Sequence, residues 1–193
     1  MRDTLVVGFG GAGSYIAEYA QGLLGCDALA INTDASALRK SSFVSKLLIG
    51  PGACKGAPAG VPQHGLLAAE ESIVELEHAL AGYVTVVLVA GFGGGTGTGA
   101  VPVVVRLARS LGKNLIVAAT LPFGFEDTRR KVALDALSDL QSEGVEVLVF
   151  DNQALLEDGS NHSTPLPDLF ARSARKISES VRARLGVCAA ETF

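Results

Sequence analysis

The chain has 193 residues and a formal net charge of −4. With 48% hydrophobic and 19% charged residues, its composition excludes a disordered protein, and the acidic balance argues against binding a nucleic-acid backbone through bulk charge. Its three widely spaced cysteines exclude a disulfide framework and predict a protein of the reducing cytoplasm. Residues 79–105 carry no charge, but six glycines in 91–99 favour a strand, loop and helix over a membrane span.

Short apolar runs rich in Val, Ile and Leu alternate along the chain with longer segments of helical periodicity. The predicted strands are residues 4–7, 28–32, 46–49, 84–90, 114–120 and 145–150. The predicted helices are residues 13–24, 65–81, 98–111, 128–143 and 168–185. Because the strands are nearly continuous apolar runs, they indicate a mostly parallel sheet with helices on both faces. The order predicts one doubly wound, Rossmann-like α/β domain of about six strands over residues 1–186, with a short tail at 187–193.

Glycine is concentrated in three segments of the chain. Of the 23 glycines, fourteen lie in residues 8–13, 50–60 and 91–99, and each segment follows a predicted strand. In a doubly wound sheet, ligands bind beyond the carboxyl ends of the strands. We therefore expect the three segments to meet at one site where a ligand approaches bare backbone.

The first glycine segment contains GFGGAG, residues 8–13, between a predicted strand and a predicted helix. It satisfies the dinucleotide fingerprint G-x-G-x-x-G, and amides at a helix N-terminus attract phosphate. Alone, the motif is equally typical of a tight turn. One hypothesis is therefore a nicotinamide-dependent oxidoreductase that uses Gly8, Gly10 and Gly13, with Asp34 near the end of the second strand. That hypothesis leaves the segment 91–99 unexplained and supplies no catalytic acid–base pair.

The second signal is GFGGGTGTGA, residues 91–100, which again follows an apolar strand and opens a helix. Its free amides and the hydroxyls of Thr96 and Thr98 can surround an anion. GGGTGTG, residues 93–99, resembles the signature of the tubulin/FtsZ family. Further segments agree with that family in order: NTDASAL from Asn32, KGAPAG from Lys55, PFGFE with Arg130, the segment at Asn152, and DLF from Asp168. The resemblance covers residues 5–185 and only the nucleotide-binding half of the family.

The resemblance implies a cytoskeletal or cell-division protein that binds GTP or GDP, with any Mg²⁺ held mainly by phosphates and water. The implied phosphate contacts are Gly10, Gly11, Gly94, Gly95, Thr96, Gly97 and Thr98, with Ala59 and Gly60 facing the γ-phosphate. Asp34, in the NTDASAL segment, is a further implied nucleotide contact. Glu126 and Arg130 would hold the ribose, Asn152 would contact the base, and Phe170 would stack on it. A carboxylate suits hydroxyls and an aromatic face suits a purine. For Glu126 and Arg130, a surface ion pair is the alternative.

Two positions depart from the family where it reads guanine. An asparagine contact falls on Tyr15, and an Asn–Asp pair in the last helix falls on Ala174 and Arg175. A guanidinium only donates hydrogen bonds, so it cannot accept from the guanine edge. The sequence therefore predicts weak discrimination between GTP and ATP. The alternative is a solvated Arg175, with guanine read by Asn152 and the backbone.

The family's hydrolytic acids follow its central helix and act on the neighbouring subunit. Here Glu191 is the only acid after Glu179. We therefore expect a short protein without the family's second domain, with little self-stimulated GTP hydrolysis, and acting as a regulator or cap of filaments. Its expected partners are itself or a full-length FtsZ-like protein. A nucleotide-free scaffold that pairs through its basic last helix is a further alternative.

Overall fold

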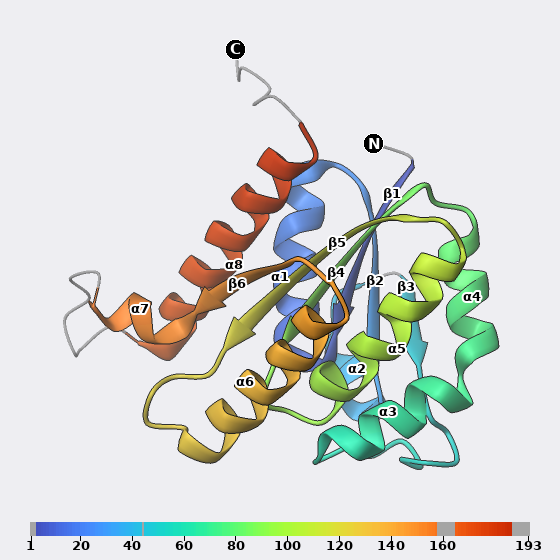
Figure 1. The fold of residues 1–193 in the computed structure, drawn as a ribbon, viewed down its shortest axis with the longest axis horizontal. Coiled ribbons are helices and arrows are strands. Elements are labelled where there is room, and N and C mark those ends of the chain that lie inside the picture. The colour runs from blue at the N-terminus through green and yellow to red at the C-terminus, as the bar shows by residue number, and fades with distance from the viewer. Residues whose placement is uncertain (1–2, 44, 158–164, 187–193) are drawn as a thin grey trace.

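A computed structural model describes residues 3–43, 45–157 and 165–186. Six parallel strands form one sheet in the order β3-β2-β1-β4-β5-β6 (Figure 1). The strands are β1 Thr4–Phe9, β2 Asp27–Asn32, β3 Ser45–Leu48, β4 Thr85–Gly91, β5 Asn114–Leu121 and β6 Val147–Asp151. This topology confirms the predicted doubly wound α/β fold. The predicted tail at 187–193, including Glu191, lies outside the described residues.

The predicted helices are present, with ends that differ by at most three residues, but one of them is divided in two and two short helices were not predicted. They are α1 Gly10–Leu24, α2 Ala35–Lys40, α3 Pro62–Glu71, α4 Ile73–Ala81, α5 Thr96–Ser110, α6 Asp127–Ser142, α7 Asn152–Glu157 and α8 Leu166–Arg184. The single helix predicted over 65–81 is two helices, α3 and α4, which meet at Ser72, whose hydroxyl accepts a hydrogen bond from the Gly50 amide. The six-residue helices α2 and α7 are too short for a hydrophobic period, so the sequence did not indicate them.

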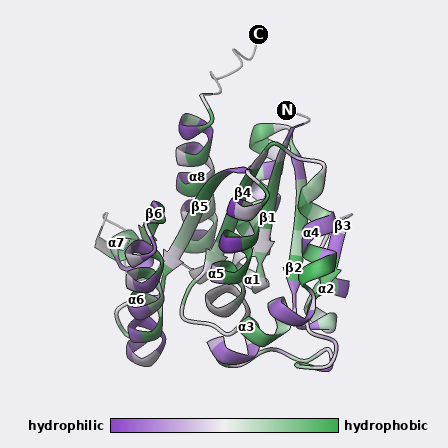
Figure 2. Cartoon of the chain, turned by 45° about the vertical axis from the view of Figure 1, so that its right-hand side comes forward, coloured by the Kyte–Doolittle hydropathy of each residue, from purple (hydrophilic) through white to green (hydrophobic). Residues whose placement is uncertain are grey.

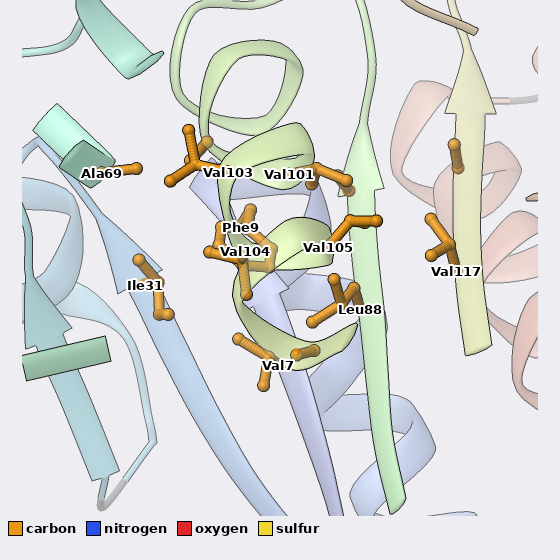
Figure 3. Packing of buried hydrophobic residues seen from close by; sticks show 14 of the residues in the cluster. Val7, Phe9, Ile31, Ala69, Leu88, Val101, Val103, Val104, Val105 and Val117 are labelled. Carbon is orange, nitrogen blue, oxygen red and sulfur yellow. The ribbon is translucent and has the colours of Figure 1, made fainter. Parts of the chain in front are cut away.

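Two apolar clusters cover the two faces of the sheet. On one face, helices α3 to α6 pack in a cluster that includes Val101, Val104 and Val105 of α5 against Val7 and Leu88 of the strands (Figure 3). On the other face, α1 and α8 form the second cluster. Strands β1 and β4 are buried on both sides, which explains why their sequences are continuous apolar runs. Figure 2 shows these central strands as hydrophobic and α6 as largely hydrophilic.

Helix α8 buries one stripe of small and aliphatic side chains. Ala174, Ile177 and Val181 are fully buried in the second cluster, where α8 packs against α1 and the sheet. Arg175 and Lys176 are exposed. Helix α8 therefore has one buried face and one exposed face that carries basic side chains. No helix in the described ranges is both long and apolar enough to cross a membrane.

Candidate functional site

A cavity of about 470 Å³ opens at the carboxyl ends of the central strands. It is lined by the start of α1, the ends of β4 and β5, the first turn of α6, and residues of α7 and α8. The lining residues are Gly11, Ala12, Tyr15, Ile16, Gly91, Phe92, Thr120, Pro122, Glu126, Arg129, Asn152, Pro167, Phe170 and Ser173. Four residues predicted from the sequence, Gly11, Glu126, Asn152 and Phe170, are among them.

The structure brings two of the glycine segments together at this edge: residues 8–13, the first glycine segment, and residues 91–99, the second. A β-carbon placed on Gly10 would lie 3.7 Å from the Thr96 Cβ and 3.8 Å from the Gly97 amide nitrogen. Gly10 itself has a φ of +67°, a conformation that favours glycine. The amino-terminal ends of α1 and α5 therefore lie side by side, each presenting free backbone amides.

The third glycine segment, residues 50–60, packs directly on the second, residues 91–99. A β-carbon on Gly95 would lie 2.8 Å from both the Ala59 Cβ and the Gly60 amide nitrogen. The buried hydroxyl of Thr33 accepts a hydrogen bond from the Ala59 amide at 3.0 Å and shares another with the Thr96 hydroxyl at 2.9 Å. Thr33 thereby fixes the segment after β3 to the start of α5, a role that the sequence did not single out.

Two glycines at the site have no steric reason to be glycine. Within the described part of the chain, a β-carbon on Gly11 or Gly94 would meet no atom within 4 Å, and neither residue has a positive φ. Gly13 differs, because a β-carbon there would lie against the Val89 carbonyl and 3.1 Å from the Ala90 Cα. Packing thus accounts for Gly13, whereas the bare backbone at positions 11 and 94 is open to a ligand.

The two threonines of the second segment brace its loop. The Thr98 hydroxyl accepts from the Gly93 amide at 2.9 Å, and Gly93 has a φ of +93°. The Thr96 hydroxyl is bonded to Thr33 and, at 3.4 Å, to the Asn32 side-chain oxygen. Both threonines are buried, so their first effect is to shape the loop, and the Thr98 hydroxyl keeps its own proton to donate.

The arginines of α6 differ from the sequence-based assignment. Arg130 was expected beside the ribose with Glu126. Its guanidinium instead bonds both carboxylate oxygens of Asp151, at 2.8 and 2.5 Å, and the Pro122 carbonyl oxygen at 2.6 Å, and it does not line the cavity. Arg129 lines the cavity and bonds Glu126 at 2.5 Å. Asp151 lies at the end of β6. Its carboxylate holds the Arg130 guanidinium outside the cavity, because a bidentate ion pair is a strong interaction.

Asp151 links α6 to α7, because its carboxylate accepts hydrogen bonds from Arg130 of α6 and from the Gln153 amide of α7. Its pKa lies below its ordinary range because Arg130 donates hydrogen bonds to the carboxylate and the Gln153 amide adds another, which together outweigh partial burial. Folding therefore lowers this pKa. The resulting stabilisation is fully present above the ordinary carboxyl pKa of about 4 and is lost as the pH falls from there through the lowered value.

We expect Asp151→Asn to lower the free energy of unfolding by about 1 kcal/mol at pH 7, because it removes one charge from a partly buried pair. The deficit should shrink as the pH falls below about 4. Urea denaturation of both chains from pH 7 to pH 3 measures it, with exposed Asp135→Asn on α6 as the control. A deficit that stays constant down to pH 3 would show that the ion pair is not its source.

Aromatic and amide side chains form the far end of the cavity. Asn152 is buried, and the Ser173 hydroxyl donates to its side-chain oxygen at 3.2 Å. Phe170 is 42% exposed, with its ring 6.1 Å from that of Phe123. Tyr15 also lines this cavity. Ser173 has no counterpart in the sequence-based site, because only the phase of α8 shows that it faces inward.

The two α8 residues at the positions where the family reads guanine, Ala174 and Arg175, do not line the cavity. Arg175 does not line the cavity; it pairs with Glu179 at 2.9 Å on the surface. Ala174 is fully buried against α1 and the sheet. This placement favours the second alternative, in which Arg175 is solvated. Asp34 has a local role in the structure, since its carboxylate caps α2 by accepting from the Ser36 and Ala37 amides.

The strand order and the converging glycine segments define a doubly wound domain with three glycine-rich segments at the carboxyl ends of its strands. The family model described as the tubulin/FtsZ family, GTPase domain, matches residues 3–160. The cell division protein FtsZ of Methanothermobacter thermautotrophicus is 42% identical over 181 residues, and that of Mycoplasmopsis pulmonis is 35% identical over 181 residues. Each alignment covers 92% of this chain but 47% and 46% of those proteins, so the chain spans about half their length.

Solved structures of FtsZ and CetZ2 have the same fold as this chain. An empty FtsZ dimer from M. jannaschii matches 99% of this chain and 56% of its own, with a TM-score of 0.86 and 31% identity. CetZ2 from Haloferax volcanii, solved as a GTPγS-bound protofilament, matches 100% of this chain and 61% of its own, with a TM-score of 0.83 and 26% identity. The chain therefore belongs to the tubulin/FtsZ family of cytoskeletal GTPases, which confirms the resemblance predicted from its motifs.

Proposed function

We propose that residues 1–186 form a nucleotide-binding domain that holds GTP or GDP in this cavity. The observation that carries the proposal is the bare backbone of Gly11 and Gly94, for which packing gives no reason, at the point where three glycine segments converge. The phosphates would contact Gly10, Gly11, Ala59, Gly60, Gly94, Gly95, Thr96, Gly97 and Thr98. The ribose would contact Glu126, and the base would contact Asn152 and Phe170.

The relatives support the identity of the ligand. The CetZ2 match is bound to GTPγS, and the family model is that of a GTPase domain. In the described ranges, no three His, Cys, Asp or Glu side chains gather to hold a metal ion. Any Mg²⁺ would therefore be held mainly by phosphate oxygens and water, as that ion commonly is.

A panel of nucleotides in a thermal-shift assay tests this function. At 100 times its dissociation constant, a ligand stabilises its protein by about 2.7 kcal/mol, which for a chain of this size raises Tm by about 5–10 °C. We expect such a shift with GTP and GDP. A shift with NAD alone would support the oxidoreductase hypothesis, and no shift with any nucleotide would support the nucleotide-free scaffold.

We further propose that the chain alone hydrolyses GTP slowly. Hydrolysis needs a group that orients or deprotonates the attacking water. The two acids predicted at the site have other partners: Asp34 caps α2, and Glu126 pairs with Arg129 in the free protein and is assigned to the ribose hydroxyls once nucleotide is bound. A full-length FtsZ-like protein that presents an acidic side chain to this face would complete the site. In that case the chain would act as a regulator or cap of filaments.

Phosphate release from GTP over a concentration series of the purified chain tests the slow turnover. We expect a rate that stays low at every concentration and rises when a full-length FtsZ is added. Fast GTP turnover that increases with the chain's own concentration would show that self-assembly completes the site. That result would contradict the proposed role as a filament cap.

A further inference from the structure

Among the described residues that line the cavity, Arg129 is the one basic side chain. It bonds the Glu126 carboxylate at 2.5 Å, and its Nε lies 3.5 Å from the Gly93 carbonyl oxygen. The backbone of Arg129 also touches the second glycine segment, since a β-carbon on Gly93 would lie 2.5 Å from the Arg129 carbonyl oxygen. Arg129 therefore lies where the glycine loop meets the ribose segment.

The two partners of this ion pair are held to different degrees. Glu126 is 23% exposed, and its other carboxylate oxygen accepts from the Phe123 amide at 3.3 Å. Arg129 is 58% exposed and, among the described residues, its side chain contacts Glu126 and makes one long hydrogen bond to the Gly93 carbonyl oxygen. A competing anion would consequently displace the arginine from the carboxylate, while the carboxylate stays in place.

Arg130, in contrast, has its guanidinium committed to the fold. Both of its terminal nitrogens are bonded to Asp151, and one also reaches the Pro122 carbonyl oxygen. Turning Arg130 toward a ligand would break these bonds and leave Asp151 without its partner, which is costly for a partly buried charge.

We infer that Arg129, and not Arg130, is the arginine that binds the nucleotide phosphates. The inference rests on the proposed function and deepens it. On binding, Arg129 exchanges the Glu126 carboxylate for a phosphate oxygen, and Glu126 is released to accept from the ribose hydroxyls. One ion pair in the free protein is thus replaced by two charge-assisted contacts with the ligand.

Dissociation constants for GDP and for guanosine, measured by titration calorimetry and by NMR shift titration, test this assignment. We expect Arg129→Ala to weaken GDP binding about 10- to 100-fold and guanosine binding less than twofold, because only GDP carries phosphate. Arg129→Lys should recover part of the loss, since it restores a point charge without the planar fork. Lys131→Ala, which removes an exposed charge from the same helix, should change neither constant.

Two outcomes would overturn the assignment. One is an unchanged ratio of the GDP and guanosine constants in folded Arg129→Ala. The other is a collapse of that ratio in Arg130→Ala but not in Arg129→Ala. Failure of the proposed function itself would be seen differently, as no binding of GDP by the native chain, and the inference would fall with it.

Discussion

Replacing Gly94 by valine is expected to lower the affinity for GTP and GDP at least ~100-fold while the free energy of unfolding of the ligand-free chain changes by less than about 0.5 kcal/mol. A β-carbon at this position meets no atom within 4 Å in the described part of the chain, and its φ is not positive, so the free protein has room for a side chain to begin here. The branched side chain would fill the space that phosphate oxygens need beside the backbone. Loss of affinity without loss of stability is the mark of a ligand-contact glycine.

Calorimetric titration with GDP and urea denaturation measure the two quantities on the same variant. Gly22→Ala is the control, because a β-carbon on Gly22 likewise meets no atom within 4 Å in the described part of the chain, and Gly22 is exposed and lies near the far end of α1. It should stabilise the helix by about 0.5–1 kcal/mol and leave GDP binding unchanged. A folded Gly94→Val chain with native affinity would remove the second glycine segment from the phosphate site.

Replacing Gly99 by alanine is expected to have the largest effect on folding. A β-carbon there would lie 2.5 Å from the Leu66 amide nitrogen and closer still to the Pro62 carbonyl oxygen, both backbone atoms of α3. Helices α3 and α5 cross at this point and could not both stay in place. Overpacking against backbone should cost about 3 kcal/mol or more, which lowers Tm by about 6–12 °C in a chain of this size.

Thermal unfolding without ligand measures this effect. Gly82→Ala serves as the control, because Gly82 has a φ of −76° and a β-carbon there meets no atom within 4 Å in the described ranges. Its stability should stay within about 0.5 kcal/mol of the native chain. A Tm for Gly99→Ala within one or two degrees of the native value would mean that the helix crossing adjusts freely.

The fold could be predicted from the sequence because its signals are local. Continuous apolar runs mark β1 and β4, which are buried on both faces, and a glycine segment directly follows each of these two strands. The family resemblance implied phosphate contacts at Gly94 and also at the adjacent Gly95. The structure shows that a side chain there would strike Ala59 and Gly60, so the uncrowded Gly94 is the cleaner choice.

The direction of single side chains at the site could not be predicted in the same way. Successive residues of a helix point about 100° apart, so an error of one residue in the phase exchanges an inward side chain for an outward one. Which of Arg129 and Arg130 faces the cavity depends on Asp151, which lies 21 residues beyond Arg130 in the sequence and comes from the end of strand β6. Likewise, Ser173 and not Arg175 faces inward because Ala174 is buried against α1.

Backbone amide chemical shifts of the 19.8 kDa chain during a titration with GDP test the proposed site most directly. If the three glycine segments bind the phosphates, the largest changes should fall on residues 10–12, 59–60 and 93–98, with smaller ones at Phe170. The amide chemical shifts of α4, which contributes no residue to the cavity lining, should not change. Absence of change at millimolar GDP, or changes confined to α4 and β3, would contradict a nucleotide site at the carboxyl ends of the central strands.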